Sequence, residues 1–219
     1  MKLVLHNYWR SSASHRVRIG LGLKQLAFDY VAIDLPSGRQ HADAYRAKNP
    51  MAQVPTLEIT GDDGVRIALT QSLAILEYLD ECWPDPPILP HDPHRRAQAR
   101  ALAELVNAGI QPMQNTATLR QVKKLGGDDA VWAQHFIASG LAAFAKLAEQ
   151  TAGEFCVGGA PTVADICLVP QLATARRYHV ELGQDFERLL AIEARCLELP
   201  AFANATPDRQ PDARAPVTS

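Results

Sequence analysis

The first eighty residues alternate between short apolar runs and longer stretches in which apolar residues recur every three or four positions. Short runs rich in β-branched and aromatic residues indicate buried strands, and the longer periodic stretches indicate amphipathic helices. Strands are predicted at 2–9, 28–33, 54–59 and 65–69, and helices at 14–26, 42–48 and 71–82. Because such alternating units need a sheet covered by helices, we expect an α/β domain over residues 1–82.

The pattern changes after residue 82. Five prolines fall between residues 83 and 93, which indicates an ordered linker over 83–94. Beyond it the chain is rich in Ala and Leu, and helices are predicted at 95–110, 114–125, 130–148, 163–178 and 186–199. We therefore expect an all-helical domain over 95–205. The last stretch, 206–219, has three prolines and several polar residues and is expected to be a flexible tail.

Composition and charge narrow the function classes. The chain has 219 residues, of which 47% are hydrophobic and 21% charged, as is ordinary for a soluble globular protein. A net charge of −2 gives no electrostatic case for nucleic acid or an anionic membrane. No apolar run is long enough to span a bilayer or to serve as a signal peptide. Four widely spaced cysteines show no metal-binding pattern, so free thiols in the cytoplasm and no metal site are expected.

The segment from Arg10 to Arg16, Arg-Ser-Ser-Ala-Ser-His-Arg, connects the first predicted strand to a helix. Exposed amides at a helix start hold anions, and a hydroxyl of Ser11 or Ser12 can donate to a thiolate. No cysteine lies in this loop, so a thiol that reacts here must come from a small molecule. The alternative is that the serines only cap the helix.

Two further motifs offer backbone groups to a ligand. Val54-Pro55 precedes a strand, where a cis peptide bond would turn the Val54 backbone towards a ligand and a trans bond would simply end a loop. Gln71-Ser72 opens a helix, where it either binds a carboxylate or only caps the helix.

Other polar residues have simpler interpretations. Thr162-Val163-Ala164-Asp165 has the spacing of a capping box, so Asp165 is assigned a structural role. Arg10 and the pair Arg176-Arg177 suit carboxylate binding, although the usual case for such arginines is a solvated surface position.

Taken together and in order, these motifs resemble the zeta class of the cytosolic glutathione transferases. Ser11–Ile19, with the sequence Ser-Ser-Ala-Ser-His-Arg-Val-Arg-Ile, is similar to the class signature, with Ala13 in place of a cysteine. Further matching segments are 49–57, 71–79, 109–115 and 164–171. The resemblance covers roughly residues 3–212. It implies a thioredoxin-like N-terminal domain followed by a C-terminal helical bundle domain.

The resemblance also implies a site. Ser11 or Ser12 would stabilise the thiolate of glutathione, with the family precedent favouring Ser11. Arg10 and Arg177 would bind substrate carboxylates. Gln40 would reach the glycyl end of glutathione, with His41 as its rival. The remaining implied contacts to glutathione are Ala13, Val54, Pro55, Gln71, Ser72, Gln111 and Asn115.

The activity that the resemblance implies is glutathione-dependent cis–trans isomerisation of maleylacetoacetate to fumarylacetoacetate, in tyrosine and homogentisate degradation. Glutathione would be the catalytic cofactor, so the chain itself need not supply a nucleophile. Isomerisation of maleylpyruvate in the gentisate route is the alternative, as is a general glutathione transferase or α-haloacid dehalogenase. A non-catalytic binding protein of the same fold is a third hypothesis. The resemblance further implies a homodimer.

Overall fold

The computed structural model describes residues 1–214 and divides into two compact units. The first unit combines residues 1–86 with the segment from Pro200 onward, and the second comprises Pro87–Leu199. The predicted linker, 83–94, is therefore not a separate segment: residues 83–86 belong to the first unit and residues 87–94 to the second. No helix within the described part of the chain is long and apolar enough to cross a membrane.

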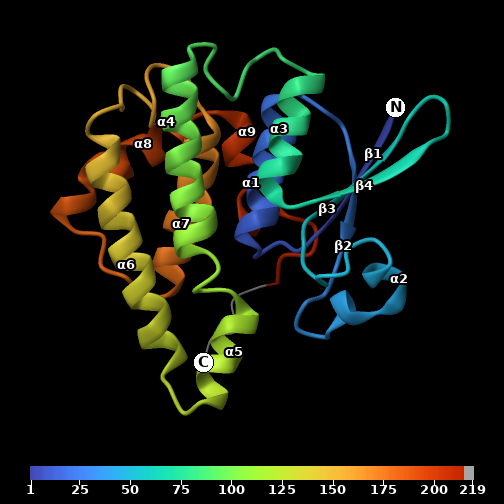
Figure 1. Ribbon diagram of the computed structural model, residues 1–219, viewed down its shortest axis with the longest axis horizontal. Coiled ribbons are helices and arrows are strands. Elements are labelled where there is room, and N and C mark those ends of the chain that lie inside the picture. Colours follow the sequence, from blue (N-terminus) through green and yellow to red (C-terminus); the bar gives the residue numbers. More distant parts are fainter. Residues whose placement is uncertain (215–219) are drawn as a thin grey trace. The chain divides into compact units, whose positions relative to one another are not determined.

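The first unit contains a four-stranded sheet at the predicted places (Figure 1). Its strands are β1 (Lys2–Asn7), β2 (Asp29–Ala32), β3 (Thr56–Thr60) and β4 (Arg66–Thr70). They lie in the order β2-β1-β3-β4, with β1 and β2 parallel and the other neighbours antiparallel. Each strand is within a few residues of its predicted range.

The core of the first unit lies on one face of this sheet. Helices α1 (Ser12–Leu23) and α3 (Ser72–Cys82) cover that face, and the short α2 (Asp43–Arg46) lies on the other side (Figure 1). Alternate side chains of β1 and β3 point to the same face, because strand side chains have a period of two. The buried cluster between sheet and helices consists of Leu3, Leu5, Val17, Leu21, Leu57, Ile59, Ile75 and Leu79.

The register of the sheet brings four loops to one edge. Thr56 at the start of β3 pairs with His6 near the end of β1 and with Thr70 at the end of β4. Asn7 at the end of β1 pairs with Ala32 at the end of β2. The loops after β1, β2 and β4 and the loop before β3 therefore leave the sheet at the same edge.

The second unit is helical, as predicted. Its helices are α4 (Pro93–Glu104), α5 (Thr116–Lys124), α6 (Asp129–Ala148), α7 (Val163–Arg177) and α8 (Glu187–Leu197). A π-helical stretch, η2 (Leu105–Ile110), continues α4, and a 3-10 turn, η3 (Gln184–Phe186), precedes α8.

The predicted capping box at the start of α7 is confirmed. Asp165 is fully buried, and its carboxylate accepts hydrogen bonds from the backbone N–H of Thr162 at 2.7 Å and of Cys156 at 2.7 Å. The hydroxyl of Thr162 accepts in turn from Ala164 N. Asp165 thus starts the most buried helix of the unit, and its structural assignment holds.

The expectation of a flexible tail over 206–219 is wrong for residues 206–214. A short helix, α9 (Pro200–Ala203), packs against α1, and a 3-10 turn, η4 (Pro207–Arg209), follows it. The polar residues that suggested disorder instead make specific bonds, such as the ion pair of Arg214 with Asp34. The helical unit accordingly ends at Leu199 rather than at 205. Residues 215–219 lie outside the described part of the chain.

Gly22 permits the close approach of α9 to α1. A Cβ atom built on Gly22 would lie 3.1 Å from the Cα of Ala201 and 3.3 Å from its carbonyl oxygen. These are backbone atoms of a packed helix, so they cannot rotate out of the way as a side-chain end can. A glycine inside α1 therefore has a packing reason that outweighs its poor helix propensity.

We predict that Gly22→Val forces α9 away from α1 and lowers stability by about 2 kcal/mol, the usual scale of overpacking. For a chain of this size that corresponds to a fall of about 5 °C in the thermal midpoint. Gly109→Val is the matched control, because a Cβ at Gly109 meets nothing within 4 Å. Equal midpoints for the two variants, measured by circular dichroism, would contradict this account of Gly22.

Candidate active site

The loop after β1 leads directly into α1, and Ser11 caps that helix. Its Oγ accepts a hydrogen bond from Ser14 N at 3.2 Å, so the capping role is confirmed. A hydroxyl that accepts in this way keeps its own proton to donate. Ser12 is the first residue of α1 and Ala13 is buried behind it. The donor role of either serine towards a thiolate stays a prediction.

The Val54-Pro55 bond is cis. It lies immediately before β3, at the edge where the four loops meet. The neighbouring Gln53 carbonyl accepts from the Tyr45 hydroxyl at 2.6 Å and from Asn49 Nδ2 at 2.7 Å. The N–H and C=O of Val54, by contrast, have no hydrogen-bond partner within residues 1–214. A half-buried backbone at the end of the sheet, with both groups unused, fits a peptide ligand that pairs with it.

The start of α3 is not capped by a side chain. Gln71 precedes the helix with φ 69° and ψ 114°, outside the regions that a non-glycine residue favours. Ser72 does not cap; its hydroxyl accepts instead from Arg16 Nη1 at 3.2 Å. The capping interpretation of Gln71-Ser72 is therefore wrong. Strained backbone and an uncapped helix start are features that recur at anion sites.

Gln40 lies on the loop after β2, in a 3-10 turn, η1 (Arg39–His41). Its side chain is buried, and Nε2 lies 3.2 Å from Nε2 of His41. Oε1 of Gln40 has no partner among the described residues, which leaves one end of a buried amide unused. His41 is exposed, so of the two rivals Gln40 has the more fixed position.

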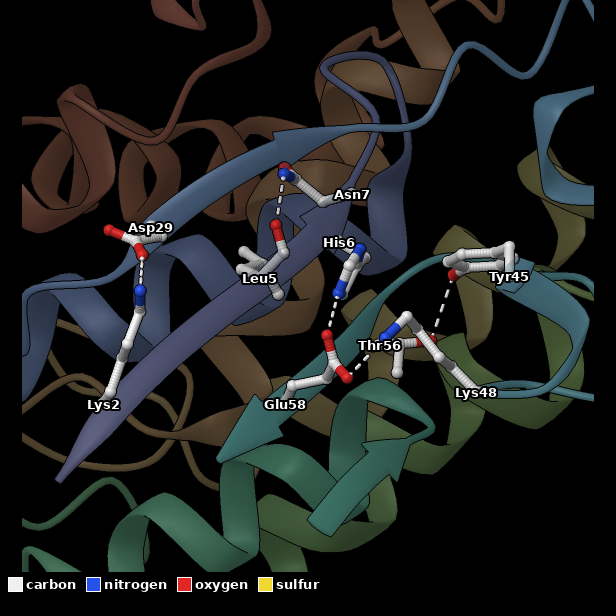
Figure 2. Close-up of polar contacts among 9 residues, drawn as sticks. All are labelled: Lys2, Leu5, His6, Asn7, Asp29, Tyr45, Lys48, Thr56 and Glu58. Atoms are coloured by element: carbon white, nitrogen blue, oxygen red, sulfur yellow. Dashed lines mark hydrogen bonds and ion pairs between the residues drawn. The ribbon is translucent and has the colours of Figure 1, made fainter. Parts of the chain in front are cut away.

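Polar contacts fix the segment around α2 to the sheet (Figure 2). The Glu58 carboxylate on β3 binds His6 Nε2 on β1 at 2.5 Å and Lys48 Nζ after α2 at 2.5 Å. Partial burial alone would raise the pKa of Glu58, but the bonds from Lys48 and His6 outweigh it and hold this pKa below its usual value. The Tyr45 hydroxyl lies 3.0 Å from Oγ1 of Thr56, next to the cis bond.

The predicted residues of the second unit occupy less distinctive positions. Asn115 caps α5, accepting from Ala117 N at 3.0 Å, and Gln111 directly follows η2. Arg176 is engaged by Glu193, whereas Arg177 is exposed with its guanidinium 5.3 Å from the ring centre of Tyr178.

Arg10, in the first unit, is likewise exposed, and its guanidinium lies 5.6 Å from the ring centre of Trp9. Within the first unit the structure therefore brings to one sheet edge the loops that carry Ser11, Val54, Gln71-Ser72 and Gln40. That arrangement is the candidate active site.

Sequence reasoning missed Arg16, which joins two of these motifs. It is fully buried, and it reaches from α1 to the hydroxyl of Ser72 at the start of α3. The signal was available in the pattern: α1 carries apolar residues on every side, so an arginine within it has no solvated face to occupy. A buried arginine requires an internal acceptor.

Comparisons with known proteins agree with this geometry. Family models for the N-terminal and C-terminal domains of glutathione S-transferases match residues 10–82 and 130–202. Maleylacetoacetate isomerase of Mus musculus is 43% identical over 216 residues, covering 98% of this chain and 96% of that protein. A crystal structure of maleylacetoacetate isomerase from Anaeromyxobacter dehalogenans, with bound GSH in its active site, is 50% identical, with a TM-score of 0.90 and coverage of 97% and 98%.

A holo structure of maleylpyruvate isomerase, a bacterial zeta-class glutathione S-transferase, is 38% identical, with a TM-score of 0.89 and coverage of 96% and 100%. The chain belongs to the zeta-class glutathione transferases. The fold class predicted from the sequence is confirmed, with its thioredoxin-like and helical parts.

His15 lies in the first motif of this zeta-class glutathione transferase and is a buried histidine with a lowered pKa. The ring is buried in α1, and Nε2 has no partner among the described residues. Burial, and then the charges of Arg18 and Arg16, hold the pKa of His15 well below its ordinary value. The folded protein therefore keeps this imidazole neutral, whereas the unfolded chain protonates it near pH 6.5.

We predict that acid destabilises the protein through His15. Because the folded pKa is depressed, its contribution is fully present above about pH 6.5 and is lost below it, by about 1.4 kcal/mol per pH unit until the folded pKa is reached. His15→Gln should flatten the dependence of the thermal midpoint on pH between 6.5 and 5, whatever its effect at pH 7.5. The exposed His91→Gln serves as control. An unchanged slope in His15→Gln would refute the assignment.

Proposed function

We propose that this chain is a glutathione-dependent cis–trans isomerase that converts maleylacetoacetate to fumarylacetoacetate. The observation that carries the proposal is the sheet register, which delivers Ser11, Val54, Gln71-Ser72 and Gln40 to one edge without any cysteine in the first loop. A site of that kind binds a thiol-bearing peptide and uses the peptide's sulfur. Identity of 43% to 50% with isomerases over nearly the full chain supports the same reaction.

The residues present fit glutathione along its whole length. The unused backbone of Val54 suits pairing with the peptide's own backbone, as in strand addition. The uncapped start of α3 at Gln71-Ser72 suits the γ-glutamyl carboxylate. Gln40, with its half-used buried amide, suits the glycyl end. Ser11 and the first amides of α1, including those of Ser12 and Ala13, suit the sulfur.

Bound glutathione supplies a thiolate, which adds to the cis double bond of the substrate and leaves after rotation about the resulting single bond. The chain's contribution is to keep that sulfur ionised and in place. The Ser11 hydroxyl donates a hydrogen bond to it, and the N-terminal end of α1 adds partial positive charge. The Arg16 bond to Ser72 holds the starts of α1 and α3 together, so that sulfur and carboxylate sites keep a fixed separation.

The substrate is a keto acid with carboxylates at both ends, and exposed arginines suit both. Arg10 and Arg177 are proposed to bind these carboxylates, with Gln111 and Asn115 contributing polar groups from the helical unit. Maleylpyruvate is the second candidate substrate, because a maleylpyruvate isomerase matches the fold with a TM-score of 0.89. The two substrates share the maleyl end and differ only in the keto-acid end.

The deciding experiment follows loss of the cis chromophore of each substrate with purified protein, with and without glutathione. Turnover of maleylacetoacetate far above maleylpyruvate, and only with glutathione, is expected. The reverse preference would assign the gentisate route. No turnover of either, with glutathione still bound, would overturn the isomerase proposal in favour of a dehalogenase or a binding protein.

We predict that Ser11→Ala lowers kcat/KM by about tenfold to a hundredfold, the loss of one hydrogen bond to a charged group. Ser12→Ala is the matched control and should have the smaller effect, since Ser11 is the residue with a fixed capping geometry. Affinity for S-methylglutathione, which has no ionisable thiol, should be unchanged in both. A larger effect of Ser12→Ala would move the thiolate role to that residue.

We predict that Arg10→Ala and Arg177→Ala raise KM for the keto-acid substrate, each by about tenfold, through loss of a charge-assisted bond to a carboxylate. KM for glutathione should stay within about twofold, since neither residue belongs to the proposed glutathione contacts. Arg176 already pairs with Glu193, so Arg176→Ala tests whether loss of any positive charge at the end of α7 raises the KM for the keto acid. Steady-state kinetics with varied substrate and varied glutathione separate these outcomes.

We further propose that the protein is cytoplasmic and forms a homodimer. No disulfide joins Cys82, Cys156, Cys167 or Cys196 within the described residues, which suits a reducing compartment. The family resemblance supports the dimer. Light scattering of the purified protein at micromolar concentration tests it directly.

A further inference from the structure

The turn that delivers Ser11 is built on one peptide unit, between Tyr8 and Trp9. The N–H of Ser11 donates to the Tyr8 carbonyl at 3.0 Å, which closes the turn. The Tyr8 N–H in turn points to Oγ of Ser14 at 3.5 Å. The position of the Ser11 hydroxyl therefore depends on the orientation of the Tyr8–Trp9 peptide.

Arg18 fixes the carbonyl side of this turn. It is 3% exposed, and its guanidinium donates to the Trp9 carbonyl at 3.1 Å, to the Tyr8 carbonyl at 3.5 Å and to Asn7 Oδ1 at 3.0 Å. The same group donates through Nε and Nη2 to the carbonyl of Ala205, at 3.1 and 3.0 Å. One buried cation thus joins the loop after β1 to the chain that follows α9.

Asp212 fixes the other side. Its Oδ2 accepts from the Trp9 N–H at 3.2 Å, and its Oδ1 accepts from the Tyr30 hydroxyl on β2. Burial and the bond to Asp212 raise the pKa of Tyr30, so the phenol remains a donor to this carboxylate. Burial lowers the pKa of Arg18 to about 10, partly offset by Tyr30 and Asp212, so the guanidinium keeps its charge near neutral pH.

We propose that Asp212 is a positioning residue of the thiolate site: with Arg18, it clamps the Tyr8–Trp9 peptide and so sets the direction in which Ser11 donates. The segment from Ala205 to Asp212 is thereby part of the active site, although it follows the whole helical unit in sequence. This segment belongs to the first unit and follows α9, which packs on α1 where Gly22 allows close approach. Asp212 binds the Trp9 N–H, and Arg18 binds the carbonyls of Tyr8 and Trp9. All three backbone groups lie within three residues of Ser11.

The effect of this clamp is specific to the sulfur. The groups proposed for the ends of glutathione, at Val54, Gln71-Ser72 and Gln40, make no hydrogen bond with residues 205–212 in the described part of the chain. Loss of the Asp212 carboxylate should therefore leave the peptide's anchoring intact and weaken only the stabilisation of its thiolate.

The test compares Asp212→Ala, Asp212→Asn and Tyr30→Phe with wild type. Two quantities are measured: the pKa of the thiol in bound glutathione, from the ultraviolet absorbance of the thiolate, and the Kd for S-methylglutathione by calorimetry. In Asp212→Ala we expect the bound thiol pKa to rise by about one unit, a tenfold loss of thiolate stabilisation. The Kd for S-methylglutathione should stay within about twofold.

Tyr30→Phe keeps the carboxylate and removes one of its partners, so a smaller shift in the same direction is expected. It also serves if Asp212→Ala does not fold, as judged by its thermal midpoint. Arg209→Ala is the matched control: Arg209 lies in the same segment and is exposed, and its guanidinium donates to Asn204 Oδ1 rather than to the loop after β1.

Because the inference rests on the proposed function, wild-type binding of glutathione is measured first, and its absence would sink the proposed function rather than the clamp. A folded Asp212→Ala with wild-type thiol pKa would overturn the clamp while leaving the isomerase proposal standing. An equal loss of binding affinity for glutathione and for S-methylglutathione would also overturn the clamp, since it would indicate general damage to the first unit.

Discussion

The pairing register of the four strands is the constraint on which the site depends. Because Thr56 pairs with His6 and Thr70, and Asn7 with Ala32, the loops of all four strands meet at one edge of the sheet. A shift of one residue in the pairing of β1 with β3 would turn the leucines of one of these strands out of the core. The same contacts that bury the core therefore fix the site, and the cluster of His6, Glu58 and Lys48 adds a polar tie on the opposite face.

Buried arginines provide the second layer of organisation. Arg16 links the start of α1 to the start of α3, and Arg18 links the end of β1 to the chain beyond α9. Each joins elements that are far apart in sequence. Each donates to a backbone or hydroxyl oxygen that would otherwise lack this hydrogen bond. The cost of burying Arg18 is offset because several charge-assisted bonds converge on its planar guanidinium. Both arginines lie on α1, so this helix holds the start of α3 and the chain beyond α9 next to the loop after β1.

The sequence predicted most elements and the local caps, but not the long-range bonds. Thr162 with Asp165 and Ser11 with Ser14 were within reach because a cap involves residues two to three positions apart. The absence of a cap at Gln71-Ser72 was not, since the partner of Ser72 is Arg16, 56 positions earlier. The segment 206–214 looked disordered because its composition is polar and proline-rich, yet Asp212 finds partners 182 and 203 positions away. The roles of the site residues towards ligands came from family resemblance rather than from any local pattern.

The discontinuity of the first unit has a consequence for biosynthesis. Its sheet and α1–α3 leave the ribosome first, but α9 and the residues that bond Tyr30 and Trp9 are made only after Pro87–Leu199. At ordinary elongation rates the intervening chain takes on the order of ten seconds to synthesise. Throughout that interval the nascent first unit lacks the partner of Gly22 and the acceptor of Arg18 at Ala205. The contacts that orient the proposed thiolate site are thus completed late, after translation has passed through the helical unit.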